Sequence, residues 1–219
     1  MKLIILLILF VNLLLGVVEA SPVIRINIPE LMLRLYDGPT LVKEYSIAVG
    51  VPYEPTPVGN FRIFYKEKSP TWYPGSGFTD KTPVPPGPDN PLGSRWMEFS
   101  PAYGIHGTNK DWSIEYPVSG GCIRMHNADV QELYDIADIG TPVIITYQSL
   151  VLLEKPGGLY LKVCPDIYGK GQNTRVNFTE LFQPYSNRYS LITKFDIPEN
   201  PPAVYEIKIG TLNAPKRVP

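Results

Sequence analysis

Apolar residues alternate with polar ones along residues 23–50, and this period of two constrains the fold more than any other feature of the sequence. Successive side chains of a β-strand point to opposite faces of a sheet, so the pattern predicts half-buried antiparallel strands. The alternating apolar residues are Ile24, Ile26, Ile28, Leu31, Leu33, Leu35, Tyr45, Ile47 and Val49. Asp37-Gly38 lies between two of these runs and suits a turn. This part of the chain is therefore predicted to form a sheet with one buried face.

The composition favours the same strand-and-loop architecture. The 219 residues include 24 prolines and 14 tyrosines, and there is little helical patterning. A hydrophobic content of 44% is enough for one core and a small appendage. The net charge of −1 gives no sign of nucleic acid or another polyanion as a partner.

Residues 1–20 have the pattern of a secretory signal peptide. Lys2 precedes an apolar run from Leu3 to Val18, and Ala20 supplies a small residue at the expected cut. The run is shorter than the roughly 20 residues of a comfortable membrane span, and an uncleaved anchor is the alternative to cleavage. In both cases the working part is expected outside the cytoplasm, in the periplasm or cell wall.

Downstream segments extend the β pattern. Strands are predicted at 61–65, 96–99, 103–106 and 141–147. Residues 70–93 are too rich in proline for regular structure, but Trp72, Tyr73 and Phe78 argue against disorder. We expect this segment to fold over a cleft, with a loop that merely covers the sheet edge as the alternative.

One helix is predicted, from Ala128 to about Ile139. Asn127 precedes it as a candidate N-cap, and Gly140 is its expected end. Residues 148–219 give a weaker pattern, with strands at 151–153, 159–163 and 204–209 and a hairpin turn at Gly157-Gly158. We therefore divide the chain into a main domain at 21–147 and an extension of unknown function at 148–219.

The stretch from Tyr103 to Asn127 carries the chemistry. Cys122 follows Ser119-Gly120-Gly121, and glycines let the backbone turn sharply and aim N–H groups at one point, as an oxyanion hole requires. A cysteine attacks carbonyls as its thiolate and needs a nearby base or positive field, which His106 supplies. The segment therefore predicts a catalytic thiol with an oxyanion pocket.

This arrangement, from His106-Gly107-Thr108 to Ser119-Gly120-Gly121-Cys122-Ile123-Arg124-Met125 with Asn127 following, resembles the L,D-transpeptidase catalytic domain of bacterial cell-wall enzymes. The resemblance includes Thr56-Pro57-Val58-Gly59 and the segment from Pro86 to Gly93, so it covers roughly residues 23–147. It implies a mainly β fold, a sandwich of mixed sheets with one α-helix after the catalytic cysteine and a small β-rich C-terminal extension. In the family, the backbone carbonyl after the histidine, here that of Gly107, orients the imidazole.

The resemblance also implies a reaction. The cysteine attacks the diamino-acid carbonyl of a peptidoglycan tetrapeptide stem, releases D-alanine and passes the acyl group from a thioester to the amine of another stem. No cofactor is required, and carbapenems acylate the same cysteine. Water as acceptor gives an L,D-carboxypeptidase, and a lipoprotein lysine gives tethering of an envelope layer. Gly120 stands where many members have a second histidine, and a catalytically inert wall-binding module is the alternative of another class.

Other residues have two interpretations each. Two cysteines in an exported protein often form a disulfide, so a Cys122–Cys164 bridge is the alternative to a catalytic thiol. His126 lies too far along the chain from Cys122 to share its proton and is expected to be structural or at the rim. Ser119, Arg124 and Tyr103 are candidate substrate contacts, although Ser119 also suits a turn and Arg124 a structural ion pair. Two histidines and two cysteines without ligand spacing make a metal site improbable.

Overall fold

The computed structural model describes residues 22–192 and 194–213. The expected signal peptide at 1–20 lies outside these residues. Within the described ranges, no helix has the length and apolarity that a membrane crossing requires. The architecture is mainly β, with mixed sheets, and the sequence prediction of the fold class is confirmed.

The first sheet has five strands in the order β3-β2-β1-β11-β5. Their bounds are Pro22–Asn27 (β1), Met32–Asp37 (β2), Thr40–Ser46 (β3), Gly59–Arg62 (β5) and Pro142–Thr146 (β11). β1 runs parallel to β11, and the other neighbours are antiparallel. Ile24 is paired with both Leu35 and Val143, and all three side chains are fully buried. The alternation of β1 and β2 thus places Ile24, Ile26, Leu33 and Leu35 on the inner face of this sheet.

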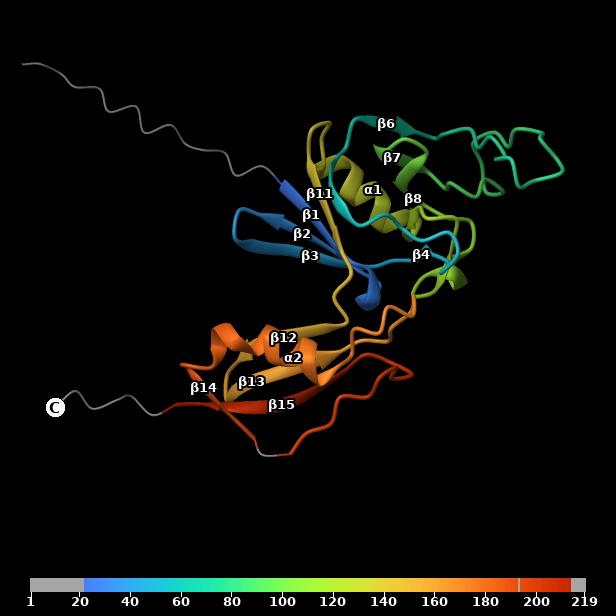
Figure 1. The fold of residues 1–219 in the computed structure, drawn as a ribbon. Helices are drawn as coiled ribbons and strands as arrows, with labels where there is room; N and C mark the ends of the chain where they lie inside the picture. The colour runs from blue at the N-terminus through green and yellow to red at the C-terminus, as the bar shows by residue number, and fades with distance from the viewer. Residues whose placement is uncertain (1–21, 193, 214–219) are drawn as a thin grey trace, which may run out of the picture.

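The second sheet has four strands in the order β10-β8-β7-β6. Their bounds are Tyr65–Lys68 (β6), Arg95–Ser100 (β7), Tyr103–His106 (β8) and Ile123–Arg124 (β10). Met97, Ile105 and Ile123 from this sheet join Ile24 and Leu35 from the first sheet in one buried core. The sheets therefore form a sandwich (Figure 1).

The predicted strand at 61–65 is divided between the two sheets. Residues up to Arg62 pair with β11, and residues from Tyr65 pair with β7. Between them, the Ile63 N–H donates to Thr141 O at 3.0 Å and the Phe64 N–H donates to Glu98 O at 2.9 Å. The chain therefore passes from the first sheet to the second within this apolar run. Alternation of apolar and polar residues does not show where such a change of sheet occurs.

Helix α1, Asn127–Ile136, follows the thiol segment and buries Val130 and Leu133 against the core. Two details of the prediction were wrong. The helix ends at Ile136, before Gly140, and Asn127 is its first residue and not its cap. The Asn127 side chain instead contacts Ser94 and Thr108, because these distant backbone groups compete with the local N–H groups of the helix.

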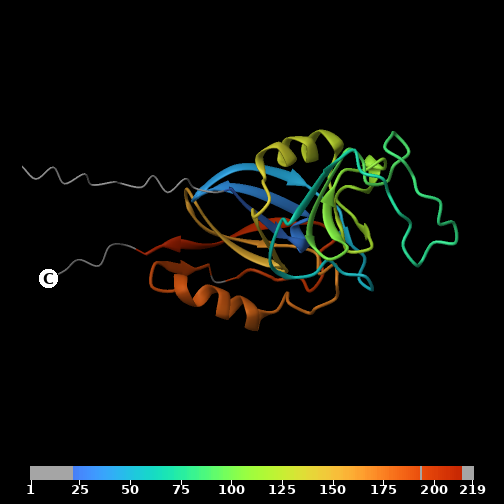
Figure 2. The same ribbon diagram turned by 90° about the horizontal axis from the view of Figure 1, so that it is seen from above.

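Residues from 150 onwards form an antiparallel sheet in the order β12-β13-β15-β14. Its strands are Leu150–Lys155 (β12), Gly158–Val163 (β13), Tyr189–Leu191 (β14) and Tyr205–Leu212 (β15). The hairpin turn is Pro156-Gly157, with Gly158 already in β13, because Lys155 pairs with Gly158. Buried side chains of the extension form a second hydrophobic core, separate from that of the sandwich. Figure 2 shows α1 and the extension's helix on opposite sides of the molecule.

The extension also contains a helix that the sequence analysis missed, α2 at Arg175–Phe182. Thr174 caps it by accepting a hydrogen bond from the Asn177 N–H at 3.1 Å. Phe178 inserts into the core of the extension beside Leu161 and Ile209. Short 3₁₀ turns occupy Ile28–Glu30, Asp111–Ser113 and Gln183–Tyr185. With only eight residues, α2 is too short for a clear helical period.

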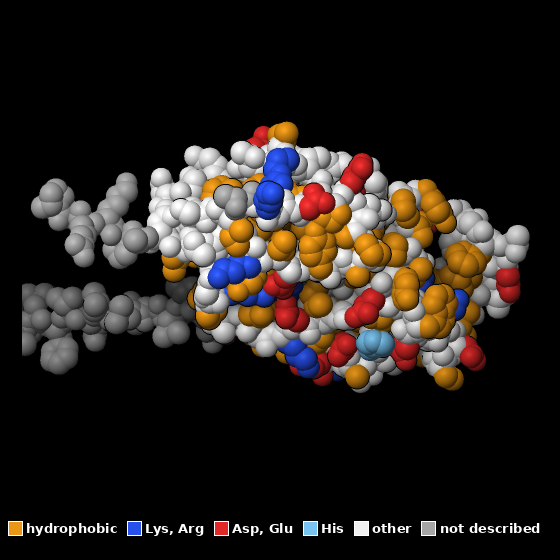
Figure 3. All heavy atoms as spheres, turned by 90° about the horizontal axis from the view of Figure 1, so that it is seen from below, with side chains coloured by type: hydrophobic (Ala, Val, Ile, Leu, Met, Phe, Trp, Pro, Cys, Tyr) orange, Lys and Arg blue, Asp and Glu red, His pale blue; other side chains and the backbone are white. Residues whose placement is uncertain are grey.

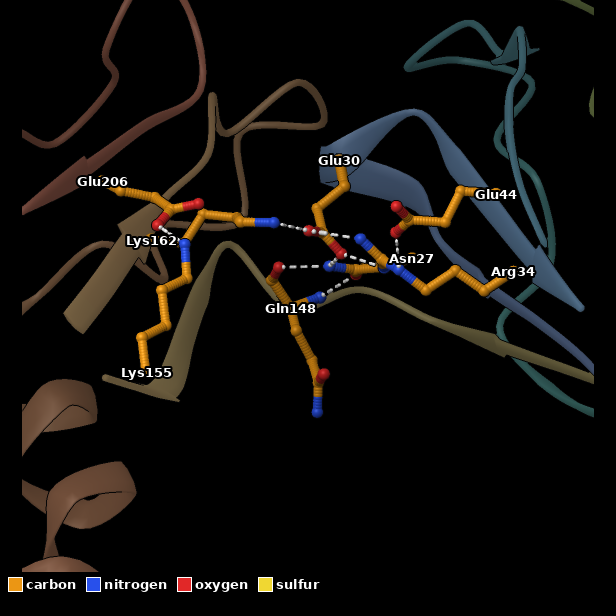
Figure 4. A network of polar contacts seen from close by, with 8 residues as sticks. All are labelled: Asn27, Glu30, Arg34, Glu44, Gln148, Lys155, Lys162 and Glu206. Carbon is orange, nitrogen blue, oxygen red and sulfur yellow. Dashed lines mark hydrogen bonds and ion pairs between the residues drawn. The ribbon is translucent and has the colours of Figure 1, made fainter. Parts of the chain in front are cut away.

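A buried polar network joins the extension to the first sheet (Figure 4). Glu30, with 6% of its side chain exposed, accepts from Arg34 Nη1 at 2.7 Å and from Lys162 Nζ of β13 at 2.7 Å. Asn27 Nδ2 donates to Glu30 at 2.9 Å and to Gln148 O at 2.9 Å. Burial opposes ionisation of Glu30, but these hydrogen bonds outweigh it and lower its pKa to about 2. The extension is thus held by a charge that has little access to bulk water.

The surface carries charges of both signs. On the face seen from below, hydrophobic side chains are interspersed with acidic and basic ones (Figure 3). No single-signed field covers this face, in agreement with the net charge of −1. The fold and not the overall charge therefore has to explain what the protein binds.

Candidate active site

The thiol lies at a sharp turn between two short strands. β9, Pro117–Ser119, pairs in parallel with β4, Val49–Gly50, and β10 begins one residue after Cys122. The Ser119 hydroxyl donates to Cys122 O at 2.6 Å and accepts from the Gly121 N–H at 3.1 Å. Ser119 is 3% exposed, so its hydroxyl is used inside the turn.

Gly121 is required by both conformation and space. Its φ is +99°, in the region that favours glycine, and a Cβ there would lie 2.5 Å from Cε1 of Tyr103. Gly120 differs, because a Cβ at that position would meet only Oε2 of Glu54, at 3.1 Å. Only the glycine directly before the cysteine is therefore demanded by the backbone.

The sequence analysis assigned both glycines to the oxyanion pocket, and the structure corrects this for one donor. The Gly121 N–H is already bonded to Ser119, because the turn closes on that hydroxyl. Neither the Gly120 N–H nor the Cys122 N–H donates a hydrogen bond within the described part of the chain. Gly120 and Cys122 also line the same cavity. Among the described residues of this turn, the N–H groups left without an acceptor thus flank Gly121.

The Gly121 carbonyl is held from behind by Thr56. Thr56 is buried, and its Oγ1 donates to Gly121 O at 3.0 Å and accepts from the Gly50 N–H at 2.9 Å. A trans peptide is planar, with its C=O and N–H pointing in opposite directions. Fixing Gly121 O therefore fixes the direction of the Cys122 N–H in the same peptide unit.

His106 ends β8, in register with Arg124 of the parallel strand β10. Residues two apart on an extended chain share a face, which places Cys122 on the side of Arg124 and His106. His106 is 4% exposed, and its Nδ1 lies 2.6 Å from Gly107 O. A carbonyl only accepts, so Nδ1 carries the proton and Nε2 is the basic nitrogen. Trp96 stacks on the imidazole with ring centroids 5.6 Å apart.

Burial is the main influence on both reactive groups. It lowers the pKa of His106 to about 4, helped by the charge of Arg124 and opposed by the carbonyls of Gly107 and Leu92. Burial also raises the pKa of the Cys122 thiol, against the Gly104 N–H and Arg124, which lower it. Both shifts favour the neutral forms of the imidazole and the thiol, so the base that the sequence analysis assigned to the thiol is His106 in its unprotonated form.

Arg124 is a cation at the cavity without an anionic partner in the described chain. It lines the cavity beside Cys122, and no salt bridge or hydrogen bond engages its guanidinium among the described residues. Burial lowers its pKa, and the interaction with Cys122 opposes that effect. A half-buried guanidinium in this position suits a carboxylate from a ligand.

The cavity has a volume of about 390 Å³. One wall comes from the proline-rich segment 70–93, which projects from the end of the second sheet (Figures 1 and 2). This segment is ordered by backbone hydrogen bonds between Trp72 and Val84 at 2.9 Å and by Asn90 Nδ2, which donates to Pro70 O at 2.8 Å. The residues of this segment that line the cavity are Trp72, Phe78, Val84, Asp89, Pro91 and Leu92. The segment thus contributes an aromatic wall to the cavity.

Asn127 connects this wall to the strand that carries His106. Its Oδ1 accepts from the Ser94 N–H at 2.9 Å, and its Nδ2 donates to Thr108 O at 2.8 Å. A Cβ on Gly93 or on Gly107 would lie 2.2 Å from Asn127 Oδ1. The two glycines therefore allow the close approach that this clamp needs.

The remaining sequence candidates lie outside the cavity. His126 is bonded to Asp111 at 2.9 Å, in a different surface hollow. Tyr103 packs its ring against Gly121 and the core and does not line the cavity. Both cysteines are free thiols, which excludes the Cys122–Cys164 disulfide from this structure, and Cys164 is fully buried. Among the described residues, no group of three or more His, Cys, Asp or Glu is placed to hold a metal ion.

Sequence reasoning missed two supports of the site. Trp96 faces His106 across the β7–β8 pair, but a regular hairpin around the turn at 101–102 would pair His106 with Met97, and only the irregularity between Glu98 and Ser100 brings Trp96 opposite His106. Tyr168, in the extension, contacts Thr56, and no local pattern signals this.

Known proteins are similar to this chain in sequence. The sequence profile of the L,D-transpeptidase catalytic domain, YkuD, matches residues 21–145, more than half of the chain. The chain belongs to the L,D-transpeptidase family. YkuD of Bacillus licheniformis is 44% identical over 115 residues, 52% of this chain and 59% of its own length. YqjB of Bacillus subtilis is 41% identical over 108 residues, 47% of this chain and 58% of its own length.

Solved structures agree on the fold. An L,D-transpeptidase determined in complex with imipenem aligns with a TM-score of 0.50 and 16% identity, covering 58% of this chain and 59% of its own. At this identity the likeness concerns the fold alone. The matched region spans about half to three fifths of the length of the L,D-transpeptidase relatives.

Proposed function

We propose that this protein is a peptidoglycan L,D-transpeptidase, a cysteine acyltransferase with residues 21–147 as its catalytic domain. The observation that carries the proposal is the single cavity that Cys122, His106 and Arg124 share, within the residues that match the family. We also propose that residues 1–20 direct export, so that the enzyme works in the periplasm or cell wall. Its partners are then stem peptides, a tetrapeptide donor and an amine acceptor.

The first half of the reaction forms a thioester. Because both reactive groups rest in their neutral forms, His106 Nε2 removes the thiol proton as Cys122 Sγ attacks the carbonyl at the L-centre of the diamino acid. The Nδ1–H bond to Gly107 O stabilises the imidazolium that results. The N–H groups of Gly120 and Cys122 receive the oxyanion. Collapse breaks the C–N bond, His106 returns the proton to the departing D-alanine amine, and a thioester remains.

The second half transfers the acyl group. The side-chain amine of another stem attacks the thioester, His106 accepts its proton, and the sulfur leaves and is reprotonated as a thiol. The product is a crosslink between two diamino acids. Water in place of the amine would give a tripeptide, and a lipoprotein lysine would give a tethered protein, so the acceptor decides between three outcomes at one site.

Arg124 is the proposed anchor for the donor. The tetrapeptide ends in the carboxylate of D-alanine, and a partly desolvated guanidinium without a protein partner among the described residues matches that group. Ser119 shapes the turn through two hydrogen bonds, and we assign it that role in place of substrate contact. Tyr103 also has a structural role, because its ring packs against Gly121.

The proposal is tested with purified tetrapeptide stems and mass measurement of the products. The wild-type protein should release D-alanine and form crosslinked dimers, and Cys122→Ala should form none while keeping the wild-type circular dichroism spectrum. His106→Ala should lose activity far more than His126→Ala, which removes the other histidine of the chain. Dimers formed by Cys122→Ala, or equal losses in the two histidine variants, would contradict the assignment.

A carbapenem separates the enzyme from an inert wall-binding module. The wild-type protein should gain the mass of one carbapenem on Cys122, and the buried Cys164 should remain unmodified. A module with a decayed site would bind peptidoglycan and show no mass increase. Tripeptide products without dimers would instead identify a carboxypeptidase.

A further inference from the structure

The segment that leaves β13 makes a compact hydrogen-bonded loop over the catalytic domain. Asp166 is buried and accepts from the Lys170 N–H at 2.9 Å, the Gly171 N–H at 2.5 Å and the Tyr147 hydroxyl at 2.5 Å. Tyr147 and Tyr168 stack with centroids 5.3 Å apart, and the Tyr168 N–H donates to the Tyr147 hydroxyl at 2.8 Å. The main chain and ring of Tyr168 are thus fixed independently of its hydroxyl.

The Tyr168 hydroxyl reaches the loop that supports the thiol turn. It donates to Gly50 O at 2.9 Å and accepts from the Thr56 N–H at 3.1 Å. It therefore bridges the two ends of the segment between Gly50 and Thr56, which are also joined by the bond from the Gly50 N–H to Thr56 Oγ1. One phenol from the extension holds Thr56 at its backbone, and Thr56 holds Gly121 O with its side chain.

We propose that Tyr168 is a positioning residue of the active site. Its hydroxyl orients Thr56, Thr56 orients the Gly121–Cys122 peptide, and the Cys122 N–H is thereby aimed at the oxyanion. The proposal deepens the proposed function, on which it rests for the role of Cys122. The C-terminal extension thereby has a role in the reaction, because its Tyr168 hydroxyl holds the residue that orients the oxyanion pocket.

A structural role and a positioning role predict different kinetics. Attack on a carbonyl builds an oxyanion that needs the Cys122 N–H, whereas alkylation by iodoacetamide displaces iodide and builds none. A misdirected N–H slows only the first reaction. A general loosening of the turn, or a change in the thiol pKa, alters both.

The test uses the full chain and two reagents that require no peptidoglycan. Acylation of Cys122 is followed by release of 4-nitrophenolate from 4-nitrophenyl acetate, and alkylation by the mass increase with iodoacetamide, each corrected with Cys122→Ala. The variant Tyr168→Phe keeps the stacked ring and removes the hydroxyl. Tyr189→Phe is the matched control, because that hydroxyl also belongs to the extension but is bonded to Glu154, at 2.9 Å.

Tyr168→Phe should slow acylation roughly tenfold, less than the 10²–10³ lost with an entire oxyanion donor, and leave alkylation within about twofold. Tyr189→Phe should change neither rate. Thr56→Val should slow acylation and spare alkylation, as Tyr168→Phe does, whereas Thr56→Ser keeps the hydroxyl and should acylate at the wild-type rate. The double variant Thr56→Val/Tyr168→Phe should be acylated no more slowly than Thr56→Val alone.

Two results would overturn the inference. One is a Tyr168→Phe protein with the acylation rate of Tyr189→Phe, and the other is an equal loss in acylation and alkylation. The failure of the proposed function is a separate observation, because it is a wild-type protein that forms no crosslinks from stem peptides, whatever the two reagents show.

Discussion

The interface between the extension and the first sheet makes a quantitative prediction. Glu30→Gln removes the negative charge that Arg34 and Lys162 share, while keeping the size and shape of the side chain. Arg34 retains Glu44, whose Oε1 lies 2.6 Å from its Nε. Lys162, with 16% of its side chain exposed, loses its carboxylate partner. The variant thus leaves a cation partly buried and unpaired.

Two routes give the expected loss of unfolding free energy. The pKa of Glu30 falls from 4.5 to about 2, which at about 1.4 kcal/mol per pH unit corresponds to roughly 3 kcal/mol. Removal of one partner from a buried ion pair costs roughly 3–5 kcal/mol. Because Arg34 keeps a second partner, we expect about 3 kcal/mol at pH 7, at the lower end of the second range.

The pH dependence follows from the direction of this shift. Glu30 has a lower pKa in the folded state than in the unfolded state, so its stabilisation is fully present above about pH 4.5 and is lost as the pH falls through about 2. The neutral amide of the Glu30→Gln variant resembles the protonated carboxyl at every pH. The difference between wild type and variant should therefore shrink to less than half by about pH 3.

Urea unfolding followed by circular dichroism measures this difference at pH 7 and pH 3. Glu206→Gln is the matched control, because the Glu206–Lys155 pair also lies in the extension but leaves 33% and 43% of its side chains exposed. An exposed pair contributes at most about 1 kcal/mol. A loss below about 1 kcal/mol for Glu30→Gln at pH 7, or a loss of equal size at both pH values, would refute the reasoning.

Four further outcomes concern the two thiols and the turn before Cys122. Burial raises the pKa of Cys122, so its alkylation rate should reach half its maximum at a higher pH than that of a free thiol measured in parallel. Arg124→Gln removes a charge that lowers this pKa and should move the profile to still higher pH, and a shift to lower pH would contradict that assignment. Gly121→Ala should lower the acylation rate at least about tenfold and reduce the melting temperature, because the φ angle of Gly121 is +99°. Gly120→Ala should keep the acylation rate within about twofold and the melting temperature within a few degrees of wild type. Similar effects of the two variants, measured by acylation kinetics and differential scanning calorimetry, would refute the distinction. Because burial raises the pKa of Cys164 to about 12, the folded Cys122→Ala protein should take up no iodoacetamide at pH 8 and one equivalent after denaturation, as measured by mass.

The sequence predicted the parts of the fold that follow from local patterns. Alternation placed Ile24 and Leu35 on a buried face, and β8 was predicted with its observed bounds, Tyr103–His106. The helix after Cys122 was found because its apolar residues Val130, Leu133, Tyr134 and Ala137 recur at helical spacing. The division of 61–65 between two sheets and the helix α2 were missed, because both are set by which strand or core lies nearby.

For the candidate site, the sequence supplied the reactive residue types and their order. It singled out Cys122, His106 and Arg124, and the structure places all three at one cavity. It did not indicate that Asn127 joins Ser94 to Thr108, because a side chain that bonds distant backbone looks the same in the sequence as a helix cap.

The sequence by itself predicted the residue types of the candidate site and determined which faces of its strands are buried, because both depend on residue types at short spacings. Only the tertiary structure decided that the thiol and the imidazole rest in their neutral forms, since burial sets their pKa values. It alone also decided that Thr56 and Tyr168 hold the peptide before Cys122. The Tyr168–Thr56 and Thr56–Gly121 hydrogen bonds join residues 112 and 65 positions apart, and only folding brings such groups within hydrogen-bonding distance.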